Sequence, residues 1–77
     1  FLKINQDVNL YLGDIEKDQI LFFTSKVERK YYLQVIKGEV KINSLILSPG
    51  DGAKIIQETE LVISGLEDSH FLLFDLP

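Results

Sequence analysis

The chain has 77 residues, of which 45% are hydrophobic and 26% are charged, and a formal net charge of −4. This length accommodates one small domain, and the composition is that of a globular chain rather than a disordered one. The acidic balance argues against a nucleic-acid partner, which would draw on clustered Lys and Arg. The absence of cysteine excludes disulfides and thiolate metal sites, so a reducing cytoplasmic compartment is the default expectation.

The chain offers no segment that predicts a membrane partner. No uncharged run approaches the ~20 apolar residues that a spanning helix needs, and no signal peptide is recognisable, so we expect a soluble domain. Lys26, Arg29 and Lys30 form a basic cluster that Glu28 interrupts, and we interpret it as a solvated loop. The first residue is Phe1 rather than Met, which favours a segment excised from a longer protein.

The first half of the chain shows the periodicity of strands. Apolar residues recur with period two, with β-branched and aromatic types at the alternating positions. Two strands are expected at residues 4–12 and 20–23, separated by a polar turn at residues 13–18. A third strand is expected at residues 31–36, ending before Gly38.

The second half continues as short strands joined by turns. Residues 40–42 and 45–47 flank Asn43-Ser44, which predicts a two-residue hairpin of moderate strength. The sequence Ser-Pro-Gly-Asp-Gly at residues 48–52 cannot continue a strand ladder and predicts a turn. Strands then follow at residues 53–57, 61–64 and 71–76, and no window has the length and caps of a helix. Seven or eight short antiparallel strands without a substantial helix predict an all-β barrel or sandwich in a single domain, residues 1–77.

Several short segments, in this order and nearly from end to end, carry a family resemblance: Gln6-Asp7-Val8, Leu10-Tyr11, Leu33-Gln34-Val35 before Gly38, Val40-Lys41-Ile42-Asn43, Leu47 with Gly50-Asp51-Gly52-Ala53, and Leu72-Leu73-Phe74-Asp75-Leu76-Pro77. With these segments the chain resembles the C-terminal cupin domain of bacterial pirin-like, quercetinase-like bicupin proteins. The resemblance implies a cupin-like jelly-roll fold and an N-terminal cupin domain in the same protein, which holds iron or another divalent metal by histidines and a glutamate. It also implies a link to the oxygenation of flavonols such as quercetin.

The ligand positions of the general cupin pattern carry other residues in this chain. The first motif asks for His-x-His, three or four residues, Glu, six residues and Gly; with Gly38 as that glycine, Tyr31 occupies the Glu position. The second motif starts at Gly50-Asp51 and asks for Pro, Gly, His and Asn. The histidine positions of the first motif fall on Ser25 and Val27, or on Thr24 and Lys26 with the longer spacing. In the second motif, Ile56, Glu58, Leu61 and Gly65 occupy the Pro, Gly, His and Asn positions in that order. Because an iron, manganese or zinc site needs converging imidazoles and a carboxylate, we expect no metal-binding, cofactor-binding or catalytic residue here.

We expect packing to fill the interior instead, and we interpret the remaining chemically capable residues as structural. Tyr31, Leu33 and Val35 share one face of a strand by alternation, as do Leu61 and Ile63. His70, the one histidine, lacks a partner in the sequence and is interpreted as a surface or structural residue. The other interpretations are these: Glu58 and Glu60 as a solvated turn rather than an acid–base pair, Asp51 as a turn-fixing acceptor, Asp7 as a backbone partner, and Tyr11, Tyr31 and Tyr32 as core or interface aromatics rather than a ligand pocket.

Three functions follow as hypotheses. The leading one is a non-catalytic, metal-free C-terminal cupin domain that packs on and stabilises a metal-bearing N-terminal cupin, and that contributes to homo-oligomers. The second is participation in a metal-dependent quercetin 2,3-dioxygenase-type enzyme. The third is a cupin that binds a small ligand, such as a flavonol or a sugar, at the barrel mouth.

Overall fold

The computed structural model describes residues 8–77, and these form eight strands and no helix. The all-β prediction is therefore confirmed. The predicted strand residue Ile4 and the Gln6-Asp7 pair lie outside the described residues. The strands are β1 (Asn9–Ile15), β2 (Ile20–Thr24), β3 (Lys30–Lys37), β4 (Val40–Ile42), β5 (Leu45–Leu47), β6 (Gly52–Ile56), β7 (Glu60–Gly65) and β8 (Ser69–Leu76).

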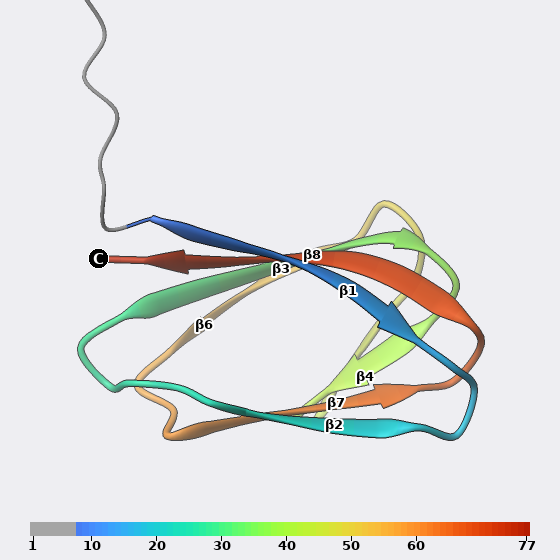
Figure 1. Cartoon of the computed structure of the whole chain (residues 1–77), viewed down its shortest axis with the longest axis horizontal. Helices are drawn as coiled ribbons and strands as arrows, with labels where there is room; N and C mark the ends of the chain where they lie inside the picture. Colours follow the sequence, from blue (N-terminus) through green and yellow to red (C-terminus); the bar gives the residue numbers. More distant parts are fainter. Residues whose placement is uncertain (1–7) are drawn as a thin grey trace, which may run out of the picture.

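The strands form two four-stranded sheets that face each other, as Figure 1 shows. The first sheet has the order β1-β8-β3-β6 and the second sheet the order β2-β7-β4-β5. Every strand pair is antiparallel. β1 and β2 are neighbours in sequence but are edge strands of different sheets, so one side of the sandwich is bordered by two free strand edges.

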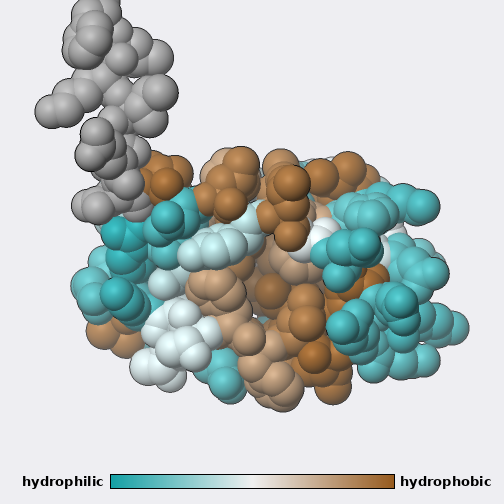
Figure 2. All heavy atoms as spheres, in the orientation of Figure 1, coloured by the Kyte–Doolittle hydropathy of each residue, from teal (hydrophilic) through white to brown (hydrophobic). Residues whose placement is uncertain are grey.

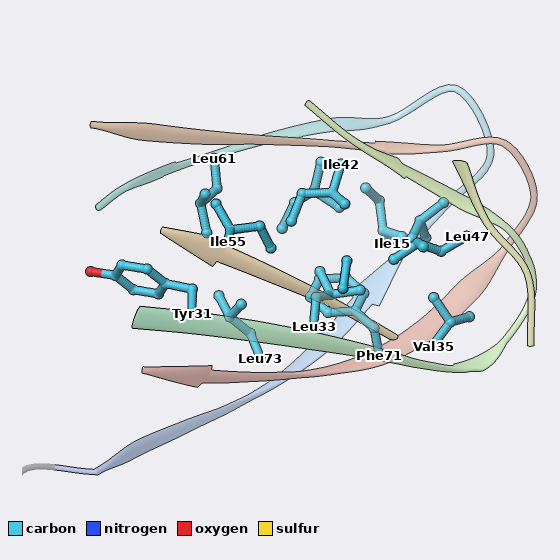
Figure 3. Packing of buried hydrophobic residues seen from close by; sticks show 13 residues of the cluster. Ile15, Tyr31, Leu33, Val35, Ile42, Leu47, Ile55, Leu61, Phe71 and Leu73 are labelled. Atoms are coloured by element: carbon cyan, nitrogen blue, oxygen red, sulfur yellow. The ribbon is translucent and has the colours of Figure 1, made fainter. Parts of the chain in front are cut away.

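The space between the sheets is filled by apolar side chains (Figure 3). In β3, Tyr31, Leu33 and Val35 are buried, and in β7, Leu61 and Ile63 are buried, as the alternation predicts. Complete burial of a large aliphatic side chain stabilises the fold by roughly 1.5–3 kcal/mol relative to its exposure. The predicted filling of the interior by packing is therefore confirmed.

The predicted turn at residues 13–18 is wrong in its first half. β1 continues through Gly13 to Ile15, whose side chain is 1% exposed in the core. A Cβ at Gly13 would overlap the ring of Phe71, so this glycine marks a close approach inside a strand rather than a turn. The chain reverses later, where the Gln19 N–H donates to the Glu16 carbonyl at 3.0 Å.

The basic cluster is also not entirely a solvated loop. Lys26 and Lys30 are exposed, but the Arg29 Nε lies 2.6 Å from an Asp75 carboxylate oxygen, and the two side chains are 17% and 12% exposed. An Arg29 Nη2 also donates to the Asp75 carbonyl at 3.2 Å. Asp75 points inward, where a buried charge needs a partner. Its ion pair with Arg29 therefore connects the start of β3 to the end of β8.

The predicted hairpin at Asn43-Ser44 is confirmed, with Asn43 at a φ of +52°. Its side-chain oxygen accepts from the Val62 N–H at 2.9 Å, and its own N–H donates to the Val62 carbonyl at 2.9 Å. Asn tolerates the left-handed region better than most side-chain-bearing residues. Asn43 therefore supplies both the turn conformation and the attachment of the hairpin to β7.

Candidate functional site

Tyr31, at the glutamate position of the first cupin motif, lies at one end of the apolar interior. Its side chain is 3% exposed, and in Figure 3 its hydroxyl points away from the other labelled residues of the cluster. The hydroxyl accepts the Lys26 N–H at 3.0 Å, and the ring packs edge-on against Phe23 with centroids 5.9 Å apart. Tyr31 thus fills the core and anchors the β2–β3 loop.

The two histidine positions of the first motif are equally unsuited to a metal. Ser25 is buried, and its hydroxyl donates to the Glu58 carbonyl at 2.6 Å, so it holds one loop against another. Val27 is exposed in the β2–β3 loop. With the longer spacing the positions fall on Thr24 and Lys26, which are exposed and carry a hydroxyl and an ammonium group.

The second motif places one residue in the core and the others on surfaces or in a turn. Leu61 is completely buried, whereas Ile56 and Glu58 are exposed. Gly65 is buried in the backbone contact between β7 and the β1–β2 turn, where its N–H donates to the Gln19 carbonyl at 2.9 Å. Its carbonyl accepts the Asp18 N–H at 2.8 Å.

These residues do not fit the metal that the cupin family implies. Tyr31 and Leu61 are part of the packed interior, where a metal would need imidazole or carboxylate donors around an open coordination position. Within residues 8–77, no group of three or more His, Cys, Asp or Glu side chains could hold a metal ion. The described interior of this sandwich is consequently a packed apolar core.

His70 lies on the outward side of β8 opposite Asp14 of β1. Its Nδ1 is 3.7 Å from an Asp14 carboxylate oxygen, and the two side chains are 50% and 81% exposed. Water screens such a pair, so it contributes little to stability. The surface interpretation of His70 agrees with this location.

The remaining carboxylates serve turns or face solvent. A carboxylate oxygen of Asp51 accepts the Ser48 N–H at 3.0 Å, which confirms its predicted turn-fixing role. Glu58 and Glu60 are both exposed; Glu60 is the first residue of β7 rather than part of the preceding turn.

An apolar groove of about 210 Å³ opens between the edge strands β1 and β2. Figure 2 shows hydrophobic atoms around this hollow in the middle of the molecule and hydrophilic residues at both ends. Of the tyrosines considered for a pocket, Tyr11 lines the groove and packs edge-on against Phe23 with centroids 5.2 Å apart. The lining comprises Tyr11, Leu12, Gly13, Leu21, Phe22, Phe23, Ile63, Phe71 and Leu73.

The sequence does not predict the groove, because its two walls, β1 and β2, are edge strands of different sheets. Their positions follow from the order of strands in each sheet, which the sequence alone does not give. Tyr32 lies elsewhere, on the outward side of β3, where its ring centroid is 6.3 Å from that of Phe74. Leu12 and Phe22 are both more exposed than buried, so they border the opening of the groove rather than close it.

Within residues 8–77, two facing antiparallel sheets around a filled apolar interior define a cupin-like β-sandwich. The model of the family described as the quercetinase C-terminal cupin domain matches residues 1–76. The chain belongs to this family, which confirms the resemblance inferred from its sequence.

The similar proteins are longer than this chain. The quercetin 2,3-dioxygenase of Escherichia coli strain K12 is 41% identical over 76 residues, which are 99% of this chain and 33% of that protein. The crystal structure of the bacterial pirin YhhW from Escherichia coli in complex with nickel(II) matches with a TM-score of 0.92 at 41% identity, covering 99% of this chain and 33% of that one. A putative quercetin 2,3-dioxygenase of Pasteurella multocida is 36% identical over 75 residues, which are 95% of this chain and 32% of that protein. The chain therefore spans about a third of the length of these relatives.

Proposed function

We propose that this chain is a non-catalytic, metal-free cupin domain that packs on and stabilises a metal-bearing N-terminal cupin domain of the same polypeptide. The observation that carries the proposal is the placement of Tyr31 and Leu61, which occupy ligand positions of the cupin motifs and are buried in the apolar core. The family is described as a C-terminal domain, and the similar proteins have room for a further domain.

Its small size supports a role in packing. A single core in a chain of this length rarely supplies more than ~3–5 kcal/mol of stability, so burying an outer face on a neighbouring domain would stabilise both domains. The nickel in the bacterial pirin structure supports a metal elsewhere in the full-length protein, because the part of this domain that the structure describes has no group of three or more His, Cys, Asp or Glu side chains that could hold one.

The proposal extends to location and partners. The chain lacks cysteine and is acidic, which favours the cytoplasm and disfavours a nucleic-acid partner. Across residues 8–77, the structure has no helix that could cross a membrane. The partner that we propose is the N-terminal cupin domain, with homo-oligomers of the whole protein as a further form of association.

A variant without the imidazole of His70 and the carboxylates of Glu58 and Glu60 tests the proposal that this domain supplies no metal ligand and no catalytic residue. We expect the full-length protein carrying His70→Ala, Glu58→Gln and Glu60→Gln to keep its bound metal and its rate of flavonol oxygenation, because all three side chains are exposed and none is held in a ligand set. The measurements are metal content by mass spectrometry and oxygen consumption with quercetin. Loss of metal from this variant, with an unchanged unfolding midpoint, would contradict the proposal.

The groove between β1 and β2 favours a second candidate, the binding of a small apolar ligand, because ligand sites are concave and largely apolar. Under the leading proposal, a panel of flavonols and sugars leaves the thermal unfolding midpoint of the 77-residue chain unchanged. A ligand that binds the folded state must raise that midpoint. A rise that Leu12→Glu abolishes and Leu10→Glu preserves would favour the ligand-binding function instead, since Leu12 lines the groove and Leu10 does not.

A further inference from the structure

The outward side of the first sheet is unusually apolar. An antiparallel sheet with one face on the core commonly has polar residues on its solvated face. In this sheet the inward positions already supply the core, including Leu33, Phe71 and Leu73. The outward positions of β1, β8 and β3 nevertheless carry a second set of apolar side chains, here called the outer apolar face: Leu10, Leu12, Tyr32, Leu72, Phe74 and Leu76.

The strand pairing makes the outer apolar face continuous. Leu10 of β1 is opposite Phe74 of β8, which in turn is opposite Tyr32 of β3, so the three side chains form one row across three strands. Leu12 and Leu72 are opposite each other in the next row, which ends at the polar Gln34 of β3. Side chains directly opposite in neighbouring strands are in contact range. Leu12 is 81% exposed and Leu10 is 54% exposed, so the outer apolar face is open to solvent in this domain. Figure 2 shows hydrophobic atoms along the upper rim of the molecule, where Figure 1 shows β1 and β8.

Charged and polar residues border the outer apolar face. At one end, Asp14 is opposite His70, and His70 is opposite Lys37, which forms a charged row across three strands. Toward the β6 edge, Lys54 is opposite Tyr32 and is exposed. An apolar centre with a polar rim is the arrangement found in protein interfaces, and large contiguous apolar patches mark interaction sites.

The outward side of the second sheet differs in this respect. Ile20 and Phe22 of β2 are exposed there, but Ile20 is opposite Ser64, which is itself opposite Lys41. Glu60 stands opposite Thr24 at the other end of the β2–β7 pair. Phe22 is opposite Val62, but this apolar pair ends at Asn43, which is hydrogen-bonded to Val62 on its other side. Polar residues thus limit the apolar ones on this sheet to a two-strand pair, whereas Leu10, Phe74 and Tyr32 form a row across three strands.

We propose that the outer apolar face is the surface on which the preceding domain of the same polypeptide packs; this inference rests on the proposed function and specifies its interface. In a full-length member of a family defined as a C-terminal domain, the rest of the chain precedes β1. β1 contributes Leu10 and Leu12 to the face, so the incoming polypeptide joins the domain beside it. A tethered partner has an effective concentration in the millimolar range, which favours it over a separate molecule.

Single cysteines test the proposed interface in the full-length protein, because this chain has no cysteine of its own. Leu10→Cys reports on the outer apolar face, and Ile20→Cys is the matched control on the outward side of the second sheet. The two positions are both aliphatic, both in edge strands, 54% and 52% exposed in this domain, and outside the lining of the groove. Cysteines outside this domain are first replaced, and the rate of reaction with a thiol reagent is measured under native conditions and in denaturant.

We expect the native reaction at Leu10→Cys to be slower than at Ile20→Cys by about tenfold or more, because a covered side chain reacts only when the interface opens. In denaturant the two rates should be equal. Equal fast rates at both positions, or protection of Ile20→Cys alone, would overturn the assignment of this face. Protection of Leu10→Cys that disappears on dilution would also overturn it, because the cover would then be a second copy of the protein.

The same samples separate this inference from the proposed function. A metal bound by this domain would refute the metal-free proposal without changing the labelling rates. Conversely, rapid labelling at Leu10→Cys in a protein whose domain holds no metal would refute the interface and leave the metal-free proposal intact.

Discussion

Replacing Leu33 by alanine is expected to remove most of the stability of this chain. Leu33 is completely buried at the centre of the sandwich, where it lies opposite Leu73 of β8 and Ala53 of β6. Truncating a buried leucine to alanine destabilises a protein by roughly 2–5 kcal/mol, because apolar contacts are lost and a cavity remains. A small core rarely supplies more than ~3–5 kcal/mol in total, so the variant should be largely unfolded at 25 °C.

Urea unfolding followed by circular dichroism measures this effect, with Leu45→Ala as the control. Leu45 is also a strand leucine but is 50% exposed at the edge of the second sheet, so its truncation should change the free energy of unfolding by about 0.5 kcal/mol or less. Equal effects of the two substitutions would mean that the interior is not packed around Leu33.

Replacing Arg29 by methionine is expected to have the second largest effect. The substitution keeps much of the apolar volume but removes the guanidinium, which leaves the inward-facing carboxylate of Asp75 without its ion-pair partner. An uncompensated charge in a mostly buried position is strongly unfavourable, and a loss of about 2–4 kcal/mol in the free energy of unfolding is expected. The same urea titration measures it.

Lys30→Met is the matched control, because Lys30 is the next residue along the chain and is exposed. Its substitution should be nearly neutral. Adding Asp75→Leu to Arg29→Met should recover part of the lost stability, since the double substitution removes the unpaired charge as well. If Arg29→Met were no more destabilising than Lys30→Met, the ion pair would not contribute to the fold.

Alternation along single strands made much of the fold predictable. Tyr31, Leu33 and Val35 are spaced so that their side chains point to one side of an extended chain, and Leu61 and Ile63 likewise. This information is local, because it depends only on the two-residue repeat of an extended chain, and it predicts the buried faces. The hairpin at Asn43-Ser44 was similarly predictable, because its turn conformation depends on a single residue in the left-handed region.

Features that depend on partners distant in the sequence were not predictable. Gly13 suggests a turn from its residue type, but its position in β1 is required by the ring of Phe71, which is distant in the sequence. Arg29 looks like part of a solvated cluster until the end of β8 brings Asp75 next to it. The substitutions at the cupin ligand positions were visible in the sequence, whereas the groove and the outer apolar face became visible only with the order of strands in the sheets.

The metal content of the 77-residue chain tests the proposed metal-free role most directly. The chain is purified, loaded in turn with excess iron(II), manganese(II), nickel(II) and zinc(II), dialysed against a chelator and analysed by inductively coupled plasma mass spectrometry. Because Tyr31 and Leu61 stand in a packed core at ligand positions, we expect no stoichiometric metal in any sample. Retention of one ion per chain by the folded domain would contradict the proposal.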